Sequence, residues 1–426
     1  MATPFSIHQA ISLAGLGVFI GITWLLSTNR KKIDWPLIIT GIALQLGFAL
    51  AILWTTPGRW LFESLGTLFN QILGFVSSGS NFAFRLNPIP GDDSFPAPDL
   101  LLRSFAFGVM PTVIFFSALM SILYHFRIMQ RVVGALARLM QRTLRTSGSE
   151  SLAVAANVFI GQTEAPLVVR PYLHCMTRSE LNALMIGGFS TISGGLLAVY
   201  AGMGINPGHL LTASVISAPA SLIIAKMLIP ETETSQTHGQ QIVSPEPDTT
   251  NALEAATVGA TDGMKLAINI IAMLIAFLGL IAMLDSIVQW IGTLFGYRDE
   301  MALTLSALIG ILCSPIAFCM GIPTGECLLS GQLIGLKIFA NEFIAYERLS
   351  SLTGADSALS PRTVVILTYA LSGFSNFASI GVQIGGISAL APERRPDLAR
   401  LGLKAMIGGV IVCCMTGCIA GLLTPN

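Results

Sequence analysis

A short polar segment, GQTEAP, interrupts an apolar stretch at residues 161–166. It brings together an amide, a hydroxyl and a carboxylate in Gln162, Thr163 and Glu164, followed by Pro166, which lacks a backbone N–H. In hydrocarbon an unpaired carboxylate and an unsatisfied backbone are both strongly unfavourable, so such a segment must be buried against protein or line a wet cavity. The segment therefore predicts a binding site at membrane depth.

The C-terminal half supplies a second polar set, which consists of Asn341, Glu342, Asn376 and Ser379. Carboxylates accept hydrogen bonds, whereas amides and hydroxyls both donate and accept them. Together the two sets suit a neutral solute that is rich in hydroxyl and amide groups.

An anionic substrate would favour a surplus of positive charge near these residues. Arg170 and Lys337 are the cations available. Each can pair with a carboxylate of its own segment, so we interpret both as members of structural ion pairs.

The elements that position these residues are predicted from a composition dominated by apolar side chains. Of the 426 residues, 53% are apolar and 11% are charged, against roughly a quarter charged in a soluble domain. Apolar runs, many near the ~20 residues that span a bilayer, cover residues 5–26, 35–54, 105–124, 181–199, 210–229, 266–287, 364–374 and 401–423. The sequence predicts an all-α polytopic membrane protein with about eight transmembrane helices.

Charge and cysteine usage exclude several other classes. The first apolar run has no basic stretch before it, so it is a retained helix rather than a signal peptide. The cysteines lie mostly within apolar runs and show neither metal-ligand spacing nor a disulfide framework. The net charge of zero gives no indication of a nucleic-acid partner, and no cofactor is expected besides a coupling ion.

Basic residues predict the orientation in the membrane. Arg30, Lys31 and Lys32 place the loop after the first helix in the cytoplasm and the N-terminus outside. Residues 57–100, rich in Pro, Gly and Asp, form an external segment with a surface helix around residues 61–75. Eight crossings then leave both termini outside, which in a bacterial inner membrane is the periplasm, and put the polar loop at residues 231–250 in the cytoplasm.

An arginine stripe follows the third apolar run. The spacing predicts an amphipathic helix on the inner leaflet, with its arginines toward phospholipid headgroups; a short solvated connector is the alternative. The five residues are Arg127, Arg131, Arg138, Arg142 and Arg145.

Two further segments, at residues 150–175 and 303–345, are apolar but interrupted by Gly, Pro and charge. In the second segment the interruptions are Pro315, Gly321, Pro323, Gly325 and Glu326. Eight crossings require both segments to enter and leave on the same side, so we predict two opposed re-entrant hairpins, the first open to the inside and the second to the outside. The tripeptide GFS recurs at residues 188–190 and 373–375, each time in an apolar helix that then breaks. Such an inverted repeat is typical of a secondary transporter with its site near the midplane.

The chain is accordingly divided into six parts. These are residues 1–100 (N-terminal transmembrane helices and external segment), 101–147 (scaffold helix and cytoplasmic amphipathic helix), 148–230 (first repeat of the transport domain), 231–261 (polar cytoplasmic loop), 262–298 (scaffold helix) and 299–426 (second repeat).

Three motifs resemble the concentrative nucleoside transporter family. They are GQTEAPLVVRPYL at residues 161–173, KIFANEFIAY at residues 337–346 and YALSGFSNFASIGVQIGG at residues 369–386. The resemblance runs from about the third helix to the C-terminus, and the first hundred residues carry little of it. It implies a homotrimer in which each transport domain moves like an elevator against a scaffold and carries one nucleoside, such as uridine, together with a cation.

The resemblance also implies roles for individual residues. Gln162, Thr163, Glu164 and Leu196 correspond to residues on the nucleobase side, Glu342, Asn376 and Ser379 to ribose contacts, and Phe374 to an apolar wall. Ordinary helix packing is the alternative for Phe374, because aromatic residues are so often part of a core.

A sodium site is implied in the same way. The matching groups are Asn157, the carbonyl of Ile160, the hydroxyl and carbonyl of Thr191, and the carbonyl of Ile192. Oxygen ligands freed by broken helices suit a small hard cation, and none of them titrates near neutrality, which favours sodium over a proton. Asn157 could instead bridge helices. Some relatives are proton-driven, and Glu164 or Glu342 could carry a proton, so a proton-coupled nucleoside symporter stays open.

Rivals from other classes are weaker. An intramembrane enzyme would use Glu164, Glu342 and His174, but the histidines are scattered without ligand spacing. A dicarboxylate carrier would need an arginine aimed at its substrate, which the GQTEAP segment lacks. A channel fits poorly with a substrate-sized site between two hairpins, and no phosphate-binding loop of the Gly-Lys-Ser or Gly-Lys-Thr type is present.

Overall fold

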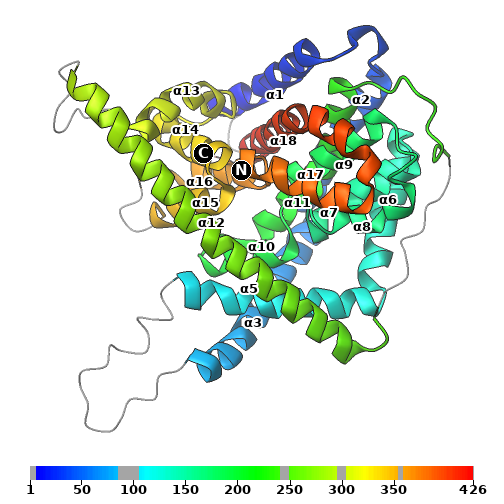
Figure 1. The fold of residues 1–426 in the computed structure, drawn as a ribbon. Coiled ribbons are helices and arrows are strands. Elements are labelled where there is room, and N and C mark those ends of the chain that lie inside the picture. Colours follow the sequence, from blue (N-terminus) through cyan, green and yellow to red (C-terminus); the bar gives the residue numbers. More distant parts are fainter. Residues whose placement is uncertain (1–5, 85–104, 240–248, 295–303, 354–357, 426) are drawn as a thin grey trace.

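The computed structural model describes residues 6–84, 105–239, 249–294, 304–353 and 358–425, and the elements within them are helices (Figure 1). Six of these helices are long and apolar enough to cross a membrane, or up to eight if each sharply bent pair counts as one span. The predicted all-α class is confirmed. The exact number of crossings stays a prediction.

The first helix runs antiparallel to the second and to the last helix, which end on the same side. They are α1 (Ile7–Leu26), α2 (Trp35–Leu53) and α18 (Arg395–Leu423). Gln9 Nε2, at the start of α1, donates to Leu422 O at the end of α18 (3.0 Å), and Lys404 Nζ, in the first half of α18, donates to Leu26 O at the end of α1 (3.2 Å). We call the end where α1 begins the outer end and the other the inner end. Both ends of the described chain thus lie on one side, as the predicted topology requires.

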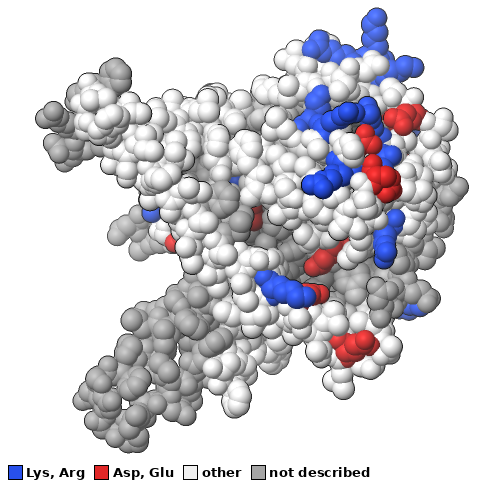
Figure 2. Space-filling view, in the orientation of Figure 1, with Lys and Arg blue, Asp and Glu red and all other residues white. Residues whose placement is uncertain are grey.

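Basic side chains gather at the inner end. Figure 2 shows Lys and Arg concentrated over the part of the surface where the α1–α2 connection, α9 and the start of α18 lie. Arg178 Nε and Arg394 Nη2 each approach Asp397, at 3.3 Å and 3.5 Å. A concentration of Lys and Arg favours the cytoplasmic side for this end.

The external segment begins with a longer helix than the sequence suggested. The helix α3 spans Thr56–Phe84, although we predicted a surface helix only around residues 61–75. Gly66 packs near Pro207 at the outer end of α11 (Pro207–Leu228), so this part of α3 lies at the outer end, and its external location stays a prediction. Residues 85–100 of this segment fall outside the described part of the chain.

The predicted arginine-rich helix is present as α6 (Ile128–Leu144), bent by 75° from α5 (Phe105–His125). Its buried face consists of Met129, Val133, Ala137, Met140 and Leu144. Arg131, Arg138, Arg142 and Arg145 are exposed. An amphipathic helix is therefore confirmed, and its contact with lipid headgroups stays a prediction.

The polar loop after α11 ends earlier than we predicted. We expected it to extend to residue 261, but α12 (Ala252–Leu294) begins at residue 252 and runs along α5 (Figure 1). Asn251 Oδ1 accepts from Glu254 N (2.9 Å) and Glu254 Oε2 accepts from Thr250 N (2.6 Å), so side chains cap the first turn. Capped in this way, the Ala-rich segment that follows is a good helix former.

The first repeat begins with a hairpin whose two open ends both lie at the inner end. Hairpin 1 consists of α7 (Gly148–Ile160), α8 (Ala165–Val168) and η2 (Arg170–Tyr172). Gly148 N donates to Thr237 O (3.1 Å), and Met176 O, just after the hairpin, accepts from Arg394 Nη2 (2.7 Å). A broken helix, α9 (Arg178–Ser190) and α10 (Gly194–Gly202), and then α11 complete the repeat.

The second repeat has the same order and the opposite direction. Hairpin 2 consists of α14 (Thr324–Phe339) and α15 (Glu342–Ser351), and a broken helix, α16 (Pro361–Leu371) and α17 (Phe377–Leu390), precedes η4 (Pro392–Arg394) and α18. Both open ends lie at the outer end: Glu326 Oε2 accepts from Ser360 Oγ (3.1 Å), and Ser350 Oγ donates to Met203 O (2.5 Å).

The second reversal does not lie where the sequence placed it. Its Gly and Pro interruptions produce a 116° bend between α13 (Leu305–Cys319) and α14, with Gly321 at φ +79°. That bend is at the outer end, because Met320 O accepts from Ser12 Oγ near the start of α1 (2.8 Å). The tip that reaches the interior is the break at Ala340, which Asn341 follows as the N-cap of α15.

Candidate functional site

The tip of hairpin 1 packs into the break of the first broken helix. Gly161 has φ +82°, and a Cβ there would lie 2.7 Å from Ser193 Cβ, between α9 and α10. Ala165 N donates to Gly161 O (3.0 Å) and closes the turn. Only glycine combines this backbone conformation with so close an approach, so the sequence GQTEAP forms the tip because Gly161 allows it.

The two broken helices meet at their GFS segments. Gly373 has φ +143°, and a Cβ there would lie 2.7 Å from Phe189 O and 2.9 Å from Ser190 C. The tripeptides that are similar in sequence are therefore neighbours in space, and the two breaks lie side by side in the interior.

Glu342 is the centre of a buried polar network. Its Oε2 accepts from Asn376 Nδ2 (2.9 Å) and its Oε1 from Tyr200 OH (3.3 Å). Asn376 Oδ1 in turn accepts from Ser379 N (2.8 Å), which caps α17. Glu342 is 5% exposed and stands at the first position of α15, where the helix N-terminus stabilises a carboxylate. The carboxylate, with about four acceptor sites, keeps room for a further donor.

Hairpin 1 joins this network through Gln162. Gln162 Nε2 donates to Ser379 Oγ (3.2 Å), and Gln162 Oε1 accepts from Gln383 Nε2 (3.0 Å). The structure thus brings together four predicted site residues from both repeats, namely Gln162, Glu342, Asn376 and Ser379.

The other predicted substrate residues make no polar bond to the network in the part of the chain that the structure describes. Thr163 and Glu164 are exposed at the tip, and neither side chain has a hydrogen-bond partner among the described residues. Leu196, on the first turn of α10, and Phe374, in the second break, are 5% and 8% exposed. Thr163 and Glu164 thus supply free polar groups, and Leu196 and Phe374 supply apolar surface.

The predicted cation ligands lie where two helices end. Asn157 and Ile160 occupy the last turn of α7, and Thr191 and Ile192 follow the last residue of α9. Asn157 Nδ2 donates to Ala153 O (3.0 Å), but Asn157 Oδ1 is buried and has no partner among the described residues. Carbonyl groups at helix C-termini carry partial negative charge, so an orphaned oxygen beside two such ends fits a small cation.

The structure does not show the ion pairs that we predicted for Lys337 and Arg170. Lys337 is 1% exposed, and its Nζ donates to Ala370 O at the end of α16 (2.9 Å) rather than to a carboxylate. Arg170 is exposed, and no ion pair joins it to another described residue. Lys337 therefore satisfies a carbonyl of the broken helix. His174, an alternative catalyst, is exposed at the inner end.

Sequence reasoning missed two members of the network, Tyr200 and Gln383. Gln383 lies in the third motif, four residues after Ser379 and hence on the same face of α17, so the helical spacing could have identified it. Tyr200 lies at the end of an apolar run on α10, and nothing in its spacing distinguishes it from a core residue.

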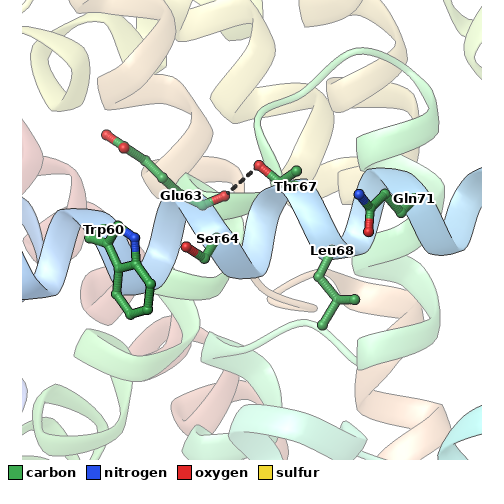
Figure 3. Close-up of a pocket in the computed structure, with 6 residues that line it drawn as sticks. All are labelled: Trp60, Glu63, Ser64, Thr67, Leu68 and Gln71. Carbon is green, nitrogen blue, oxygen red and sulfur yellow. Dashed lines mark hydrogen bonds between the residues drawn. The ribbon is translucent and has the colours of Figure 1, made fainter.

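A surface hollow of about 360 Å³ lies elsewhere, along α3. Figure 3 shows that its lining residues, Trp60, Glu63, Ser64, Thr67, Leu68 and Gln71, come from this single helix. A hollow on one face of one helix lacks the convergent polar groups of a binding site. We therefore assign the site to the hairpin tips.

Family models cover most of the chain. Residues 14–86 match the N-terminus and residues 209–421 the C-terminus of a family described as Na+ dependent nucleoside transporter, and residues 106–206 match a model described as nucleoside recognition.

Individual proteins match over nearly the whole chain. An uncharacterized transporter from Haemophilus influenzae is 43% identical, over 96% of this chain and 97% of its own. Solute carrier family 28 member 3 from Homo sapiens and sodium/nucleoside cotransporter 1 from Rattus norvegicus are 39% and 38% identical over 98% of this chain. The chain spans 60% and 64% of the length of these two proteins.

Solved structures agree with this assignment. CNTnw in an outward-facing state and CNTnw in an inward-facing substrate-bound state superpose with TM-scores of 0.90 and 0.89, at 38% identity and with 98% of both chains covered. These proteins are transporters, and the chain is a multi-pass membrane protein rather than an enzyme. It belongs to the concentrative nucleoside transporters, the family of Na+-dependent nucleoside transporters.

Proposed function

We propose that this protein is a secondary active symporter that imports nucleosides such as uridine across the bacterial inner membrane, driven by a sodium gradient. The observation that carries the proposal is the buried network in which Gln162 of one repeat bonds to Ser379 of the other, beside the Glu342–Asn376 bond. Groups from both repeats converge there at two helix breaks, which is the arrangement of a midplane transporter site.

The donor and acceptor types at this site suit the two halves of a nucleoside. Glu342, Asn376 and Ser379 form the ribose side, because a carboxylate with free lone pairs accepts from hydroxyl groups. Gln162, Thr163, Glu164 and Leu196 form the nucleobase side. Phe374 forms an apolar wall against which a base can pack.

Sodium binds in this proposal between the C-termini of α7 and α9. Asn157 Oδ1, Thr191 and the carbonyls of Ile160 and Ile192 supply neutral oxygen ligands, and the orphaned Asn157 oxygen favours a cation over a proton. One cation is sufficient energetically. A potential of 100 mV contributes about 2.3 kcal/mol per charge and a tenfold gradient about 1.4 kcal/mol, enough for several-hundred-fold accumulation of a neutral solute.

Family membership supports a proposal for the wider assembly. We infer a homotrimer in which each protomer carries its site like an elevator between two faces of the membrane, with the two hairpins re-entrant from opposite sides and both termini in the periplasm. The opposite directions of the two repeats support the opposed hairpins, and the basic inner end supports the orientation of the termini.

The test is uptake of radiolabelled uridine into proteoliposomes. One set has an inward sodium gradient, and the other has an inward proton gradient with sodium absent. We expect saturable accumulation in the first set. Accumulation in the second set alone would retain the substrate and overturn the ion site, and no accumulation in either would overturn the proposed function.

A further inference from the structure

Gln383 lies next to the proposed nucleobase residue Gln162 but is not itself among the predicted contacts. It is 2% exposed on α17. Its Nε2 donates twice, to Gln162 Oε1 (3.0 Å) and to Met185 O on α9 (3.1 Å). The side chain therefore connects the tip of hairpin 1 to both broken helices.

The backbone carbonyl of Met185 determines which way both amides face. A carbonyl can only accept, so the NH2 group of Gln383 must point toward Met185. The same NH2 group then requires Gln162 to present its oxygen to Gln383, which turns Gln162 Nε2 toward Ser379 and the site. A fixed acceptor on α9 thus sets the orientation of the tip amide through one intervening residue.

A glycine on α9 makes room for this junction. A Cβ at Gly188 would lie 2.8 Å from Gln383 Nε2 and 2.9 Å from Gln162 Cβ. Gly188 is helical, where glycine costs about 1 kcal/mol relative to alanine. The close approach of the two glutamines is therefore built into the packing of α9.

Gln383 also has an unpaired group that a packing role would avoid. Its Oε1 is buried and has no partner among the described residues. Leaving such a group unsatisfied costs about 1–3 kcal/mol, whereas an apolar side chain of similar size would cost nothing of this kind. An amide at this buried position thus points to a role in the site.

We propose that Gln383 is a positioning residue that fixes the amide of Gln162 with its NH2 group toward the nucleobase, so that the site selects bases that present an acceptor there. This inference rests on the proposed nucleoside transport. Uridine and cytidine exchange donor and acceptor at ring position 4 and at N3, so they form a matched pair of probes for that edge.

The experiment compares kcat/KM for uridine and cytidine uptake in Gln383→Glu and in the unchanged protein. A carboxylate cannot donate, so Gln162 must rotate and present its oxygen to the site. We expect the uridine-to-cytidine ratio of kcat/KM to change by about tenfold, mostly through KM, as one exchanged hydrogen bond predicts. In Gln383→Leu, which leaves the Gln162 amide free, the ratio should move toward one.

Gln130→Glu is the matched control. Gln130 Nε2 also donates to a backbone carbonyl, Tyr124 O (2.9 Å), and its Oε1 is likewise buried without a described partner, but it lies on α6. The uridine-to-cytidine ratio of kcat/KM in Gln130→Glu should equal that of the unchanged protein. Gln162→Glu, which places an acceptor at the tip with Gln383 intact, should change the ratio in the same direction as Gln383→Glu and covers the case in which the latter does not fold.

The outcomes separate the two proposals. If the unchanged protein takes up nucleosides and the uridine-to-cytidine ratio is the same in Gln383→Glu and Gln383→Leu, the positioning role is wrong and nucleoside transport stands, even where Gln162→Glu changes the ratio. If the unchanged protein takes up neither nucleoside, nucleoside transport is wrong and the positioning role fails with it.

Discussion

Replacement of Glu342 by glutamine tests the ribose side of the site most directly. Glu342 accepts from Asn376 Nδ2 at 2.9 Å and from Tyr200 OH at 3.3 Å. Asn376 cannot turn around, because its Oδ1 is held by Ser379 N. The new amide must therefore keep its oxygen toward Asn376 and place its NH2 group toward Tyr200, whose hydroxyl can also accept. The substitution preserves the fold of the network and removes only the charge and the acceptors on one side.

The magnitude follows from the lost interaction with a ribose hydroxyl. A hydrogen bond to a charged acceptor contributes about 1.5–3 kcal/mol, and each 1.4 kcal/mol corresponds to about a factor of ten. We expect kcat/KM for uridine uptake by Glu342→Gln to fall by about 10- to 150-fold. Tyr200→Phe, which leaves the carboxylate with Asn376, should cost about tenfold or less.

The assay is uptake into proteoliposomes of uridine, 2′-deoxyuridine and 3′-deoxyuridine. If Glu342 binds a ribose hydroxyl, the penalty of the substitution should largely disappear for the deoxynucleoside that lacks this hydroxyl, as in a double-mutant cycle. Unchanged uridine uptake would refute the assignment. An equal penalty for all three nucleosides, in a variant with an unaltered unfolding temperature, would refute the contact with ribose.

Two further substitutions test the rest of the site, and a third tests a buried ion pair between Lys226 of α11 and Glu150 of α7. Asn157→Leu removes the orphaned oxygen, so we expect the sodium concentration that gives half-maximal uptake to rise at least about tenfold. The measurement is uridine uptake as a function of sodium concentration. An unchanged half-saturation concentration would contradict the ion site. Gly161→Ala places a Cβ against Ser193 at a residue with φ +82°, at a cost of at least about 1–2 kcal/mol, so uridine uptake should fall strongly. The control is Gly134→Ala, which has open space around it and should leave uptake unaltered. Lys226→Met leaves Glu150 (2.7 Å away) without its buried cation and should destabilise the protein by about 3–5 kcal/mol. In thermal unfolding, the double variant Lys226→Met/Glu150→Gln should recover part of the lost stability. A double variant as unstable as Lys226→Met would contradict the pairing.

Much of the fold could be predicted because lipid is a demanding solvent. Apolar runs near the length of a bilayer crossing define helices with little ambiguity, and interruptions such as GQTEAP can be tolerated only in the interior. The second reversal was misplaced because its outer bend has strong local signals in Gly321 and Pro323. The functional break at Ala340 has neither glycine nor proline beside it, and its only local signal is Asn341, a helix N-cap.

The residue types of the site could be predicted, but their pairing could not. Gln162 and Ser379 are 217 residues apart in sequence, and Tyr200 and Glu342 are 142 apart. Such pairs depend on how two broken helices cross, which no local pattern contains. For the same reason Lys337 was assigned to an ion pair, although its amine lies against the last turn of α16, where a free backbone carbonyl needs a donor.

The proposed cation and nucleoside sites are coupled through the geometry of hairpin 1. Ile160, whose carbonyl faces the cation in this proposal, immediately precedes Gly161, and Gln162 follows at the tip. A cation held between the ends of α7 and α9 therefore fixes the residue that must present its amide to the base. Gln162 bonds to Ser379 of the other repeat, so ordering the tip also orders the ribose side. Because coupling between two ligands is reciprocal, a bound nucleoside must raise the affinity for sodium by the same factor, which is the property that lets a gradient of one drive the accumulation of the other.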